Sequence, residues 1–430
     1  MEQLAFLGGA PIIENPLPQY QSIGDEEEDA LSSVIRTGIL SGFYGSPGPE
    51  FMGGPQVQAF EAAWRKVYNV KAAISVNSNT SGLIAALGAI GLSPGDEVIV
   101  PPYTMSATVV SPLFYGGIPV FVDIEQDTFC LNPTLVEQAI SPKTRAIIAV
   151  NLFGHPAQIV ELRALADRHG IYLIEDTAQA PMSFDGKNQA GTVGHIGVFS
   201  LNYHKHIHTG EGGVCVTNDI QLAQRIALIR NHGENVVSDL GETDLTNMIG
   251  FNFRMTEMAA AIGCVQLKNI DRHISLREHI GATLSAGVMD LHGITPPKVR
   301  ENCRHNYYCW CPRVDEDLLG ISRDLFSRAL KAEGFPHEQG YIPPLYMLPV
   351  FQERIAIGRD GYPFNLTQRT YKRGLCPTTE RLYEHEVLMF EPCAYQLEDA
   401  DLRDLVAAFQ KVHSNLPSLQ KYMANKETGV

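Results

Sequence analysis

Several hallmarks of membrane and secreted proteins are absent from this sequence of 430 residues. No window approaches about 18 uninterrupted apolar residues, and residues 1–19 lack a basic segment followed by a long apolar core. The sequence therefore predicts neither a membrane-spanning helix nor a secretory signal, and it favours a cytoplasmic protein. The eight cysteines are scattered without any Cys-x-x-Cys pair, and several lie in apolar runs. This pattern is typical of reduced, mostly buried thiols rather than of a disulfide framework.

Positive charge is also scarce. The chain has 33 Lys and Arg residues against 48 Asp and Glu residues, a formal net charge of −15. Such a charge repels nucleic acid and anionic membranes, so neither is expected as a partner. Any anionic ligand has to be held by local hydrogen-bond donors.

The chain is long enough for a large domain with a smaller companion. Seven short apolar runs alternate with turn signals and helical patterns, at residues 72–77, 97–102, 118–124, 145–153, 171–176, 196–201 and 212–218. This alternation predicts an α/β fold in which a mainly parallel sheet lies between two layers of helices.

The pattern changes after Asn218. Residues 256–291 predict one long helix or a broken pair, and residues 292–430 mix short strands, such as 306–314, with helices. We therefore expect a large α/β domain over 1–272 and a smaller α+β domain over 273–430. Residues 1–20 are expected to form an N-terminal arm that packs on the small domain.

Ligands of open α/β sheets bind at the carboxyl ends of the strands, and three such ends carry reactive or polar residues. The first is the turn "NSNTSG", Asn77 to Gly82. Small side chains and a helix N-terminus favour an anion here. The structural alternative is that Thr80 or Ser81 caps the helix. The turn matches neither a P-loop nor a Gly-x-Gly-x-x-Gly fingerprint, so the motifs for nucleoside triphosphates and dinucleotides are missing.

The second is "IEDTAQAP", in which Asp176 and Gln179 follow an apolar strand. A carboxylate at the end of a buried strand costs desolvation energy unless a cation or several donors meet it. The alternative is a structural acid that caps a helix beginning at Thr177.

The third is "SLNYHKHIHTGEGG", Ser200 to Gly213. Lys205 lies in a tight turn between two core strands, where desolvation favours a neutral, nucleophilic amine, so Schiff-base chemistry is the sharpest interpretation. His204, His206 and His208 alternate, and on an extended strand they share one face while Lys205 points away. No metal site is predicted, because a central lysine opposes cation binding and only Glu211 accompanies the histidines. The three histidines are expected either to contact the substrate or to contact and orient the residues that react with it.

Six motifs in register resemble those of the DegT-type sugar aminotransferases, a pyridoxal-phosphate family of the aspartate-aminotransferase fold, also called fold type I. The similarity runs from about residue 5 to 412. The matching segments are "SNTSGL", "GLSPGDEVIVPPYTMSAT", "GGIPVFVDIEQDTFCLNP", "LIEDTAQAP", "FSLNYHKHIHTGEGG" and "GFNFRMTEMAAAIGCVQLKNID".

The resemblance implies a role for each motif. Lys205 would form the Schiff base with pyridoxal 5'-phosphate and then act as general base and acid of the proton shift. Asp176 would hold the pyridinium nitrogen protonated, and Gln179 would donate to the phenolic oxygen.

The phosphate contacts are implied in the same way. Thr80, Ser81 and Ser200 would hold the phosphate, and Asn252 would reach it from the neighbouring subunit, which implies a homodimer with shared active sites.

One position departs from the family pattern. Met105 stands where most members have an aromatic residue stacked on the cofactor ring, and a thioether is a softer and more flexible contact. Tyr103 would be an alternative stacker only if the turn were rotated. Tyr103, His204, His206 and Tyr341 are the candidate substrate contacts.

The resemblance implies an aminotransferase that passes through pyridoxamine 5'-phosphate. It would move an amino group from L-glutamate or L-glutamine to a keto-sugar or keto-cyclitol, in amino-sugar or aminocyclitol antibiotic biosynthesis. A nucleotide-linked 3- or 4-keto sugar is the alternative acceptor, with phosphate contacts from Lys298, Arg300 and Arg304. A sugar dehydratase would have histidine in place of Lys205, and a non-catalytic relative would have lost Lys205 or Asp176. Both residues are present.

Overall fold

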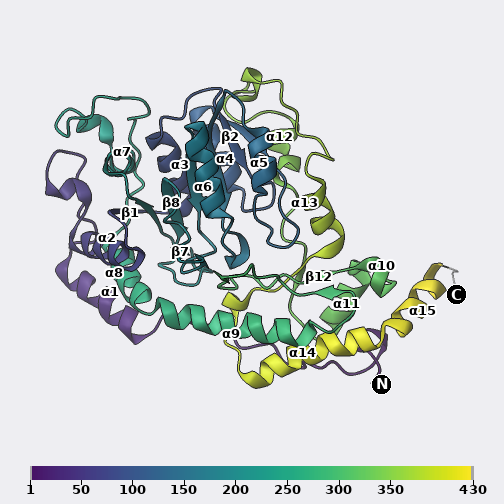
Figure 1. The fold of residues 1–430 in the computed structure, drawn as a ribbon. Helices are drawn as coiled ribbons and strands as arrows, with labels where there is room; N and C mark the ends of the chain where they lie inside the picture. The colour runs from purple at the N-terminus through teal and green to yellow at the C-terminus, as the bar shows by residue number, and fades with distance from the viewer. Residues whose placement is uncertain (1, 428–430) are drawn as a thin grey trace.

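The computed structural model describes residues 2–427. Its main body is a sheet between helices, and the long helix α9 runs beneath this body toward the region that holds the N-terminus and the C-terminal helices (Figure 1).

The central sheet has seven strands in the order β1-β9-β8-β5-β4-β2-β3. Their bounds are β1 Ala72–Val76, β2 Glu97–Val100, β3 Ile118–Phe121, β4 Thr144–Val150, β5 Tyr172–Asp176, β8 Ile196–Ser200 and β9 Gly213–Thr217. Strand β9 is antiparallel to both of its neighbours, and all other pairs are parallel. The predicted mainly parallel sheet, and each of its seven strands, is confirmed.

Helices cover both faces of this sheet because its strands are apolar on both sides. In β2, Val98 and Val100 pack in the core on one face while Ile99 packs in the core on the other. The helices of the main body are α1 Asp25–Thr37, α2 Pro55–Tyr68, α3 Asn79–Ala89, α4 Ala107–Val110, α5 Pro133–Ala139, α6 Ile159–His169, α7 Ile220–Arg230 and α8 Glu257–Lys268.

The predicted helical segment 256–291 is a broken pair. Helix α8 ends at Lys268, and α9 (Ile270–Val288) begins after Asn269. One face of α9 carries Ile280, Leu284 and Val288 into a separate core beneath the main body.

The C-terminal region combines helices with short two- and three-stranded sheets. Its helices are α10 Glu316–Leu319, α11 Arg323–Ala332, α12 Pro349–Gln352, α13 Pro377–Arg381, α14 Asp399–Ser414 and α15 Leu416–Glu427. Its short strands are β10 Ile294–Thr295, β11 Cys303–Arg304, β12 Arg313–Val314, β13 Glu338–Gln339 and β14 Leu388–Met389. Strand β11 extends the hairpin of β6 Phe184–Asp185 and β7 Asn188–Gln189, which lies between β5 and β8 in the chain.

The strand predicted over 306–314 is wrong in its first half, whereas Trp310 and Arg313 form antiparallel bridges with Phe390 and Val387, and β12 forms at the end. In the first half, the Asn306 amide donates to the Gly154 carbonyl and the Cys309 amide to that of Phe153. Tyr307 also has a φ of 51°, which an extended strand does not permit.

The N-terminal arm contacts the C-terminal region. The Ala5 amide donates to the Glu333 carboxylate at 2.8 Å, and Leu4 is buried in the core that α9, α11 and α14 share. Residues 345–376, by contrast, contribute Tyr346, Phe351 and other side chains to a core of the main sheet. The domain boundary after residue 272 stays a prediction.

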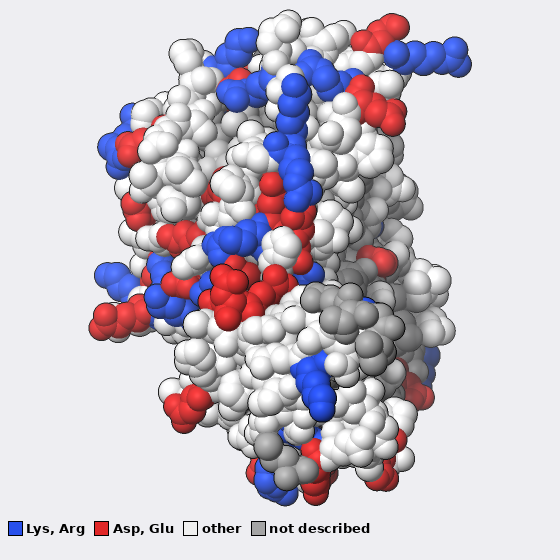
Figure 2. All heavy atoms as spheres, turned by 90° about the vertical axis from the view of Figure 1, so that its right-hand side faces the viewer, with Lys and Arg blue, Asp and Glu red and all other residues white. Residues whose placement is uncertain are grey.

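Charges of both signs are interspersed on the face drawn in Figure 2. Many charged side chains pair within the chain; Arg313, for example, bonds both Asp127 and Glu386. No described helix is both long and apolar enough to cross a membrane.

Candidate active site

A cavity of about 170 Å³ lies where strands β4, β5 and β8 end. Asp176 is the last residue of β5, Ser200 is the last of β8, and both line it together with Lys205. The other lining residues are Ser78, Asn79, Thr80, Thr104, Met105, Ala107, Val150, Ala178, Gln179, Asn202, His204, Glu211 and Gly212. The three predicted motifs therefore meet at one edge of the sheet, as parallel strand ends do.

The Asp176 carboxylate is buried and held by three donors. The Thr108 hydroxyl lies 2.8 Å from Oδ2, and Asn79 Nδ2 and the Ala178 amide donate to Oδ1 at 3.3 and 3.2 Å. Burial raises the pKa of Asp176, while these hydrogen bonds and the positive charge of Lys205 oppose that rise. The carboxylate is thus buried and fixed in orientation at the floor of the cavity.

The turn before α3 brings small polar groups to the helix N-terminus. Ser78 is the N-cap residue and accepts from the Ser81 amide at 3.1 Å, so the expectation that Thr80 or Ser81 is the cap is wrong. The Ser81 hydroxyl instead donates to Asn77 Oδ1 at 2.6 Å, and Ser81 is buried and does not line the cavity.

The backbone at this turn is tightly packed. A Cβ on Gly213 would lie 2.7 Å from the carbonyl carbon of Ser78. Strand β9 can therefore start this close to the turn only because its first residue is glycine. The exposed end of α3 therefore offers amide and hydroxyl donors, together with the positive end of the helix dipole, to an anion.

Lys205 is half-buried in the lining of the cavity. Burial lowers the pKa of its amine, although nearby groups that include Asp176 favour the charged form. Its Nζ donates a hydrogen bond to the Tyr308 hydroxyl at 3.1 Å and lies 4.4 Å from the centre of that ring. The amine therefore lies at the cavity wall, held by Tyr308.

The three histidines do not share a face. Residues 201–212 form turns rather than an extended strand, because the Lys205 amide bonds back to Asn202 and the Thr209 amide to Leu201. His204 is exposed and lines the cavity beside Lys205, so the expectation that Lys205 points away from it is wrong.

His206 is buried behind the cavity, and its Nδ1 lies 3.4 Å from the Cys393 sulfur. Burial lowers the pKa of His206 to about 3 and that of His204 to about 4, so both rings are neutral near pH 7. His208 accepts from the Gly210 amide at 3.3 Å. Within residues 2–427, no group of three or more histidine, cysteine, aspartate or glutamate side chains is arranged to hold a metal.

Gln179 links the cavity to the predicted substrate residue Tyr341. Its Oε1 accepts from the Phe153 amide at 2.7 Å, and its Nε2 donates to the Tyr341 hydroxyl at 3.2 Å. Tyr103 is fully buried against the rings of Tyr341 and Phe153 and does not line the cavity.

Met105 lines the cavity mouth with 58% of its surface exposed. Its sulfur accepts from the Ala107 amide at 3.3 Å, which fixes the thioether over the opening. Asn252 is exposed and outside the lining, and its side chain accepts from Arg254 at 2.7 Å.

Four residues of the site were missed by the sequence-based analysis: Asn79, Thr108, Asn202 and Tyr308. Asn79 lies inside the "NSNTSG" motif, and Asn202 lies inside the lysine motif, so both could have been found from their position. Thr108 and Tyr308 reach the site through tertiary packing, and no local pattern marks them.

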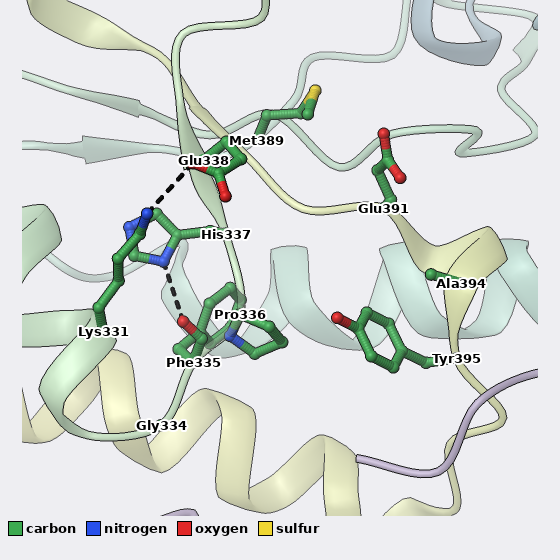
Figure 3. Close-up of a pocket in the computed structure, with 10 residues that line it drawn as sticks. All are labelled: Lys331, Gly334, Phe335, Pro336, His337, Glu338, Met389, Glu391, Ala394 and Tyr395. Atoms are coloured by element: carbon green, nitrogen blue, oxygen red, sulfur yellow. Dashed lines mark hydrogen bonds and ion pairs between the residues drawn. The ribbon is translucent and has the colours of Figure 1, made fainter. Parts of the chain in front are cut away.

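A second hollow of about 490 Å³ lies between strand β14 and the end of α11 (Figure 3). Lys331 at its edge is paired with Glu338 at 3.2 Å. Glu391 lies on the opposite side, and its carboxylate makes no hydrogen bond or ion pair with any residue from 2 to 427. Burial raises the pKa of Glu391, and the charge of Lys205 opposes the rise.

The donor set of the first cavity fits pyridoxal phosphate. A buried carboxylate suits a pyridinium nitrogen, an enclosed amine suits an aldehyde, and a helix N-terminus with small side chains suits a phosphate. In addition, Asn202 Oδ1 is buried and has no hydrogen-bond partner among the described residues. Asn202 lines the cavity, so a polar ligand bound there could supply the missing partner.

Comparison with known proteins decides the family. The model of the DegT/DnrJ/EryC1/StrS aminotransferase family matches residues 47–410. The chain belongs to this family. As a DegT/DnrJ/EryC1/StrS member, it is a pyridoxal-phosphate-dependent aminotransferase, and the resemblance read from the six motifs is confirmed.

Similarity to individual members of the DegT/DnrJ/EryC1/StrS family extends over nearly the whole chain. The L-glutamine:2-deoxy-scyllo-inosose aminotransferase of Streptomyces kanamyceticus is 34% identical over 95% of this chain and 96% of its own. GDP-perosamine synthase of Caulobacter vibrioides is 34% identical over 72% of this chain and 84% of its own. The crystal structure of an aminotransferase from Psychrobacter cryohalolentis superimposes with a TM-score of 0.80 and 28% identity, covering 93% of this chain and all of that one. The expected fold, fold type I, is thereby confirmed.

Proposed function

We propose that this aminotransferase transfers the amino group of L-glutamine or L-glutamate to the ketone of a cyclitol or a free sugar. The observation that carries the proposal is the similarity to L-glutamine:2-deoxy-scyllo-inosose aminotransferases of several actinomycetes, at 30–34% identity over at least 95% of the chain. Aminocyclitol or amino-sugar biosynthesis is the corresponding pathway class.

In this proposal each residue of the cavity has a defined task. When bound, pyridoxal phosphate supplies an aldehyde that takes up an amino group and a ring that accepts electrons. Lys205 would anchor the aldehyde between turnovers and would move the proton of the amino donor. Asp176 would keep the ring nitrogen protonated, and Gln179 would donate to the phenolic oxygen.

The phosphate is assigned to the N-terminal end of α3. Thr80, Ser81 and Ser200 surround it in this proposal, with the amide groups at the start of α3. Asn252 belongs to the site of the second subunit of a homodimer, which agrees with its exposed position outside the cavity of its own chain.

The nucleotide-linked acceptor is the second candidate, and the similarity to GDP-perosamine synthase favours it. The cations expected to contact its phosphates are engaged elsewhere. Lys298 pairs with Asp127 at 2.9 Å, Arg304 forms two bonds with Glu278, and Arg300 donates to the Pro156 carbonyl at 2.8 Å. Because these pairs would have to break before binding a diphosphate, we favour the acceptor without a nucleotide.

A two-by-two acceptor and donor screen tests the proposal. Keto-cyclitols and nucleotide-linked keto-sugars are each supplied with L-glutamine or L-glutamate, and the aminated product is measured by mass spectrometry. We expect turnover of a keto-cyclitol or a free keto-sugar at a kcat/KM at least tenfold above that of any nucleotide-linked acceptor. The reverse order would assign the nucleotide-linked substrate instead.

A further inference from the structure

The hydroxyl of Tyr308 is the hydrogen-bond acceptor that the Lys205 amine faces. Nζ lies 3.1 Å from the hydroxyl oxygen and 4.4 Å from the ring centre, so one side chain contacts the amine through both its polar group and its π face. Tyr308 lies 103 residues beyond Lys205, in the irregular segment that leads to β12.

The structure fixes Tyr308 from several sides. Its amide donates to the Asn306 side chain at 3.2 Å, and Asn306 in turn donates to the Pro181 carbonyl at 2.8 Å. The rings of His204 and His206 lie 6.3 and 5.9 Å from its ring. The two histidines that flank the lysine in sequence thus both contact the tyrosine that the lysine bonds.

We propose that Tyr308 is a positioning residue for proton transfer by Lys205, and that His204 and His206 hold its ring in place. The proposal rests on the aminotransferase reaction of the family and not on the identity of the acceptor. During each half-reaction the lysine must be released as a free amine, take a proton from one carbon and return it to another.

A tyrosine hydroxyl can serve both protonation states of that amine. Toward the ammonium it accepts a hydrogen bond, and toward the neutral amine it can turn and donate one. The face of the ring also stabilises the ammonium. Burial raises the pKa of Tyr308 far above neutrality, so the hydroxyl keeps its proton and remains available in both roles.

Other groups around the amine do not replace this contact. Those that interact electrostatically with Lys205 are Asp176, His204, His206, Glu391, Cys309 and Cys393. Among residues 2–427, only Tyr308 forms a hydrogen bond with Nζ, at 3.1 Å. Removal of the Tyr308 hydroxyl therefore leaves the Lys205 amine without a hydrogen-bond partner. This loss disfavours the ammonium form more than the neutral amine.

The test compares Tyr308→Phe with Tyr307→Phe, the same deletion one residue away. In the loaded enzyme, the single-turnover rate of the donor half-reaction is measured with ordinary and α-deuterated L-glutamine and L-glutamate. In the cofactor-free protein, the pH dependence of Lys205 acylation is followed by mass spectrometry, which reports the protonation of the amine without catalysis.

We expect Tyr308→Phe to slow the half-reaction about tenfold or more, with KM for the donor changed less than about twofold. The deuterium isotope effect should increase, because proton transfer becomes more rate-limiting. The pKa of Lys205 in the cofactor-free protein should fall. Tyr307→Phe should leave all these readouts unchanged.

An unchanged rate and isotope effect in Tyr308→Phe would overturn the proposal. So would a slower rate with the same isotope effect and the same Lys205 titration, because that combination marks a purely structural role. If Tyr308→Phe does not fold, a fluorinated tyrosine is placed at position 308 instead. Ring fluorination lowers the pKa of the hydroxyl with little change in side-chain shape. The rate of the half-reaction should then change with the acidity of the hydroxyl. Insensitivity to the fluorination would contradict the proposal.

Discussion

The Thr108 hydroxyl donates a hydrogen bond to Asp176 Oδ2 at 2.8 Å, and both side chains are buried. Thr108 lies in the short helix α4 and Asp176 at the end of β5, so the contact joins two elements on the wall of the cavity. Together with Asn79 and the Ala178 amide, the hydroxyl stabilises the carboxylate against the cost of burial.

Replacement of Thr108 by valine should weaken pyridoxal phosphate binding about tenfold, because the isosteric methyl group cannot donate to Asp176 and the ionised carboxylate is less favoured. The dissociation constant is measured by absorbance titration of the cofactor-free protein. Thr108→Ser, which retains the hydroxyl, is the matched control and should bind nearly as the parent does. Equal affinity in valine and serine variants would show that the hydrogen bond does not support the cofactor.

Replacement of Lys205 by alanine should lower the rate of transamination by at least about 10³-fold, because in the proposed site this residue is both the covalent anchor and the base. The parent protein should be yellow with pyridoxal phosphate, and borohydride should fix the cofactor on the peptide that contains Lys205. Lys187→Ala, at an unrelated lysine in the turn between β6 and β7, should leave the colour and the labelled peptide unchanged. Labelling of another lysine in the parent would contradict the assignment.

Replacement of Glu391 by glutamine should lower the pKa of Lys205. The negative charge of Glu391 favours the ammonium form of the lysine, against the burial that lowers its pKa. Without that charge, the neutral amine is populated at lower pH. The acidic limb of the pH–rate profile of the donor half-reaction should therefore shift to lower pH. Glu338→Gln, in the same hollow but paired with Lys331, should leave the limb in place. A shift to higher pH would contradict the electrostatic argument.

Loss of one partner of the buried pair between Glu61 and Arg230 should strongly destabilise the main body. Glu61 Oε1 accepts from Arg230 at 2.6 Å and from the Ser75 amide at 2.8 Å, so it ties α2 and α7 to β1. Glu61→Ala leaves the Arg230 charge buried and should lower the free energy of unfolding by about 3–5 kcal/mol. The measurement is denaturant unfolding of the cofactor-free protein. Glu137→Ala, which breaks an exposed pair with Arg168, should cost less than about 1 kcal/mol. A similar loss of unfolding free energy in the two variants would show that the buried pair contributes no more to stability than the exposed pair.

The proposed shared active site predicts complementation between two impaired variants. In a hybrid dimer of Lys205→Ala and Asn252→Ala chains, one site has both defects and the other has neither. After the subunits are mixed and exchanged, activity should return to about a quarter of the parent level, since about half of the dimers are hybrids with one intact site each. Two portions of Lys205→Ala protein mixed with each other serve as the control and should stay inactive. No recovery despite proven exchange would place Asn252 in the site of its own chain.

Much of the architecture could be predicted because it rests on local patterns. The seven apolar runs identify the strands of the sheet, and the strand-end rule brings Asp176, Ser200 and Lys205 to one edge. The error at 306–314 has a physical cause: that segment is apolar because it is buried between two parts of the molecule, and burial alone does not distinguish a strand from an irregular chain. The histidine alternation misled for a related reason, since a two-residue period has meaning only where the chain is extended.

The sequence by itself determined the family and the cofactor, and it predicted the reacting lysine, because these depend on residue types at short, fixed spacings. Only the tertiary structure decided what those residues touch. Thr108 on Asp176 and Tyr308 on Lys205 come from segments 68 and 103 residues away along the chain. Such contacts follow from how helices and loops pack around the strand ends, and no short-range periodicity records them.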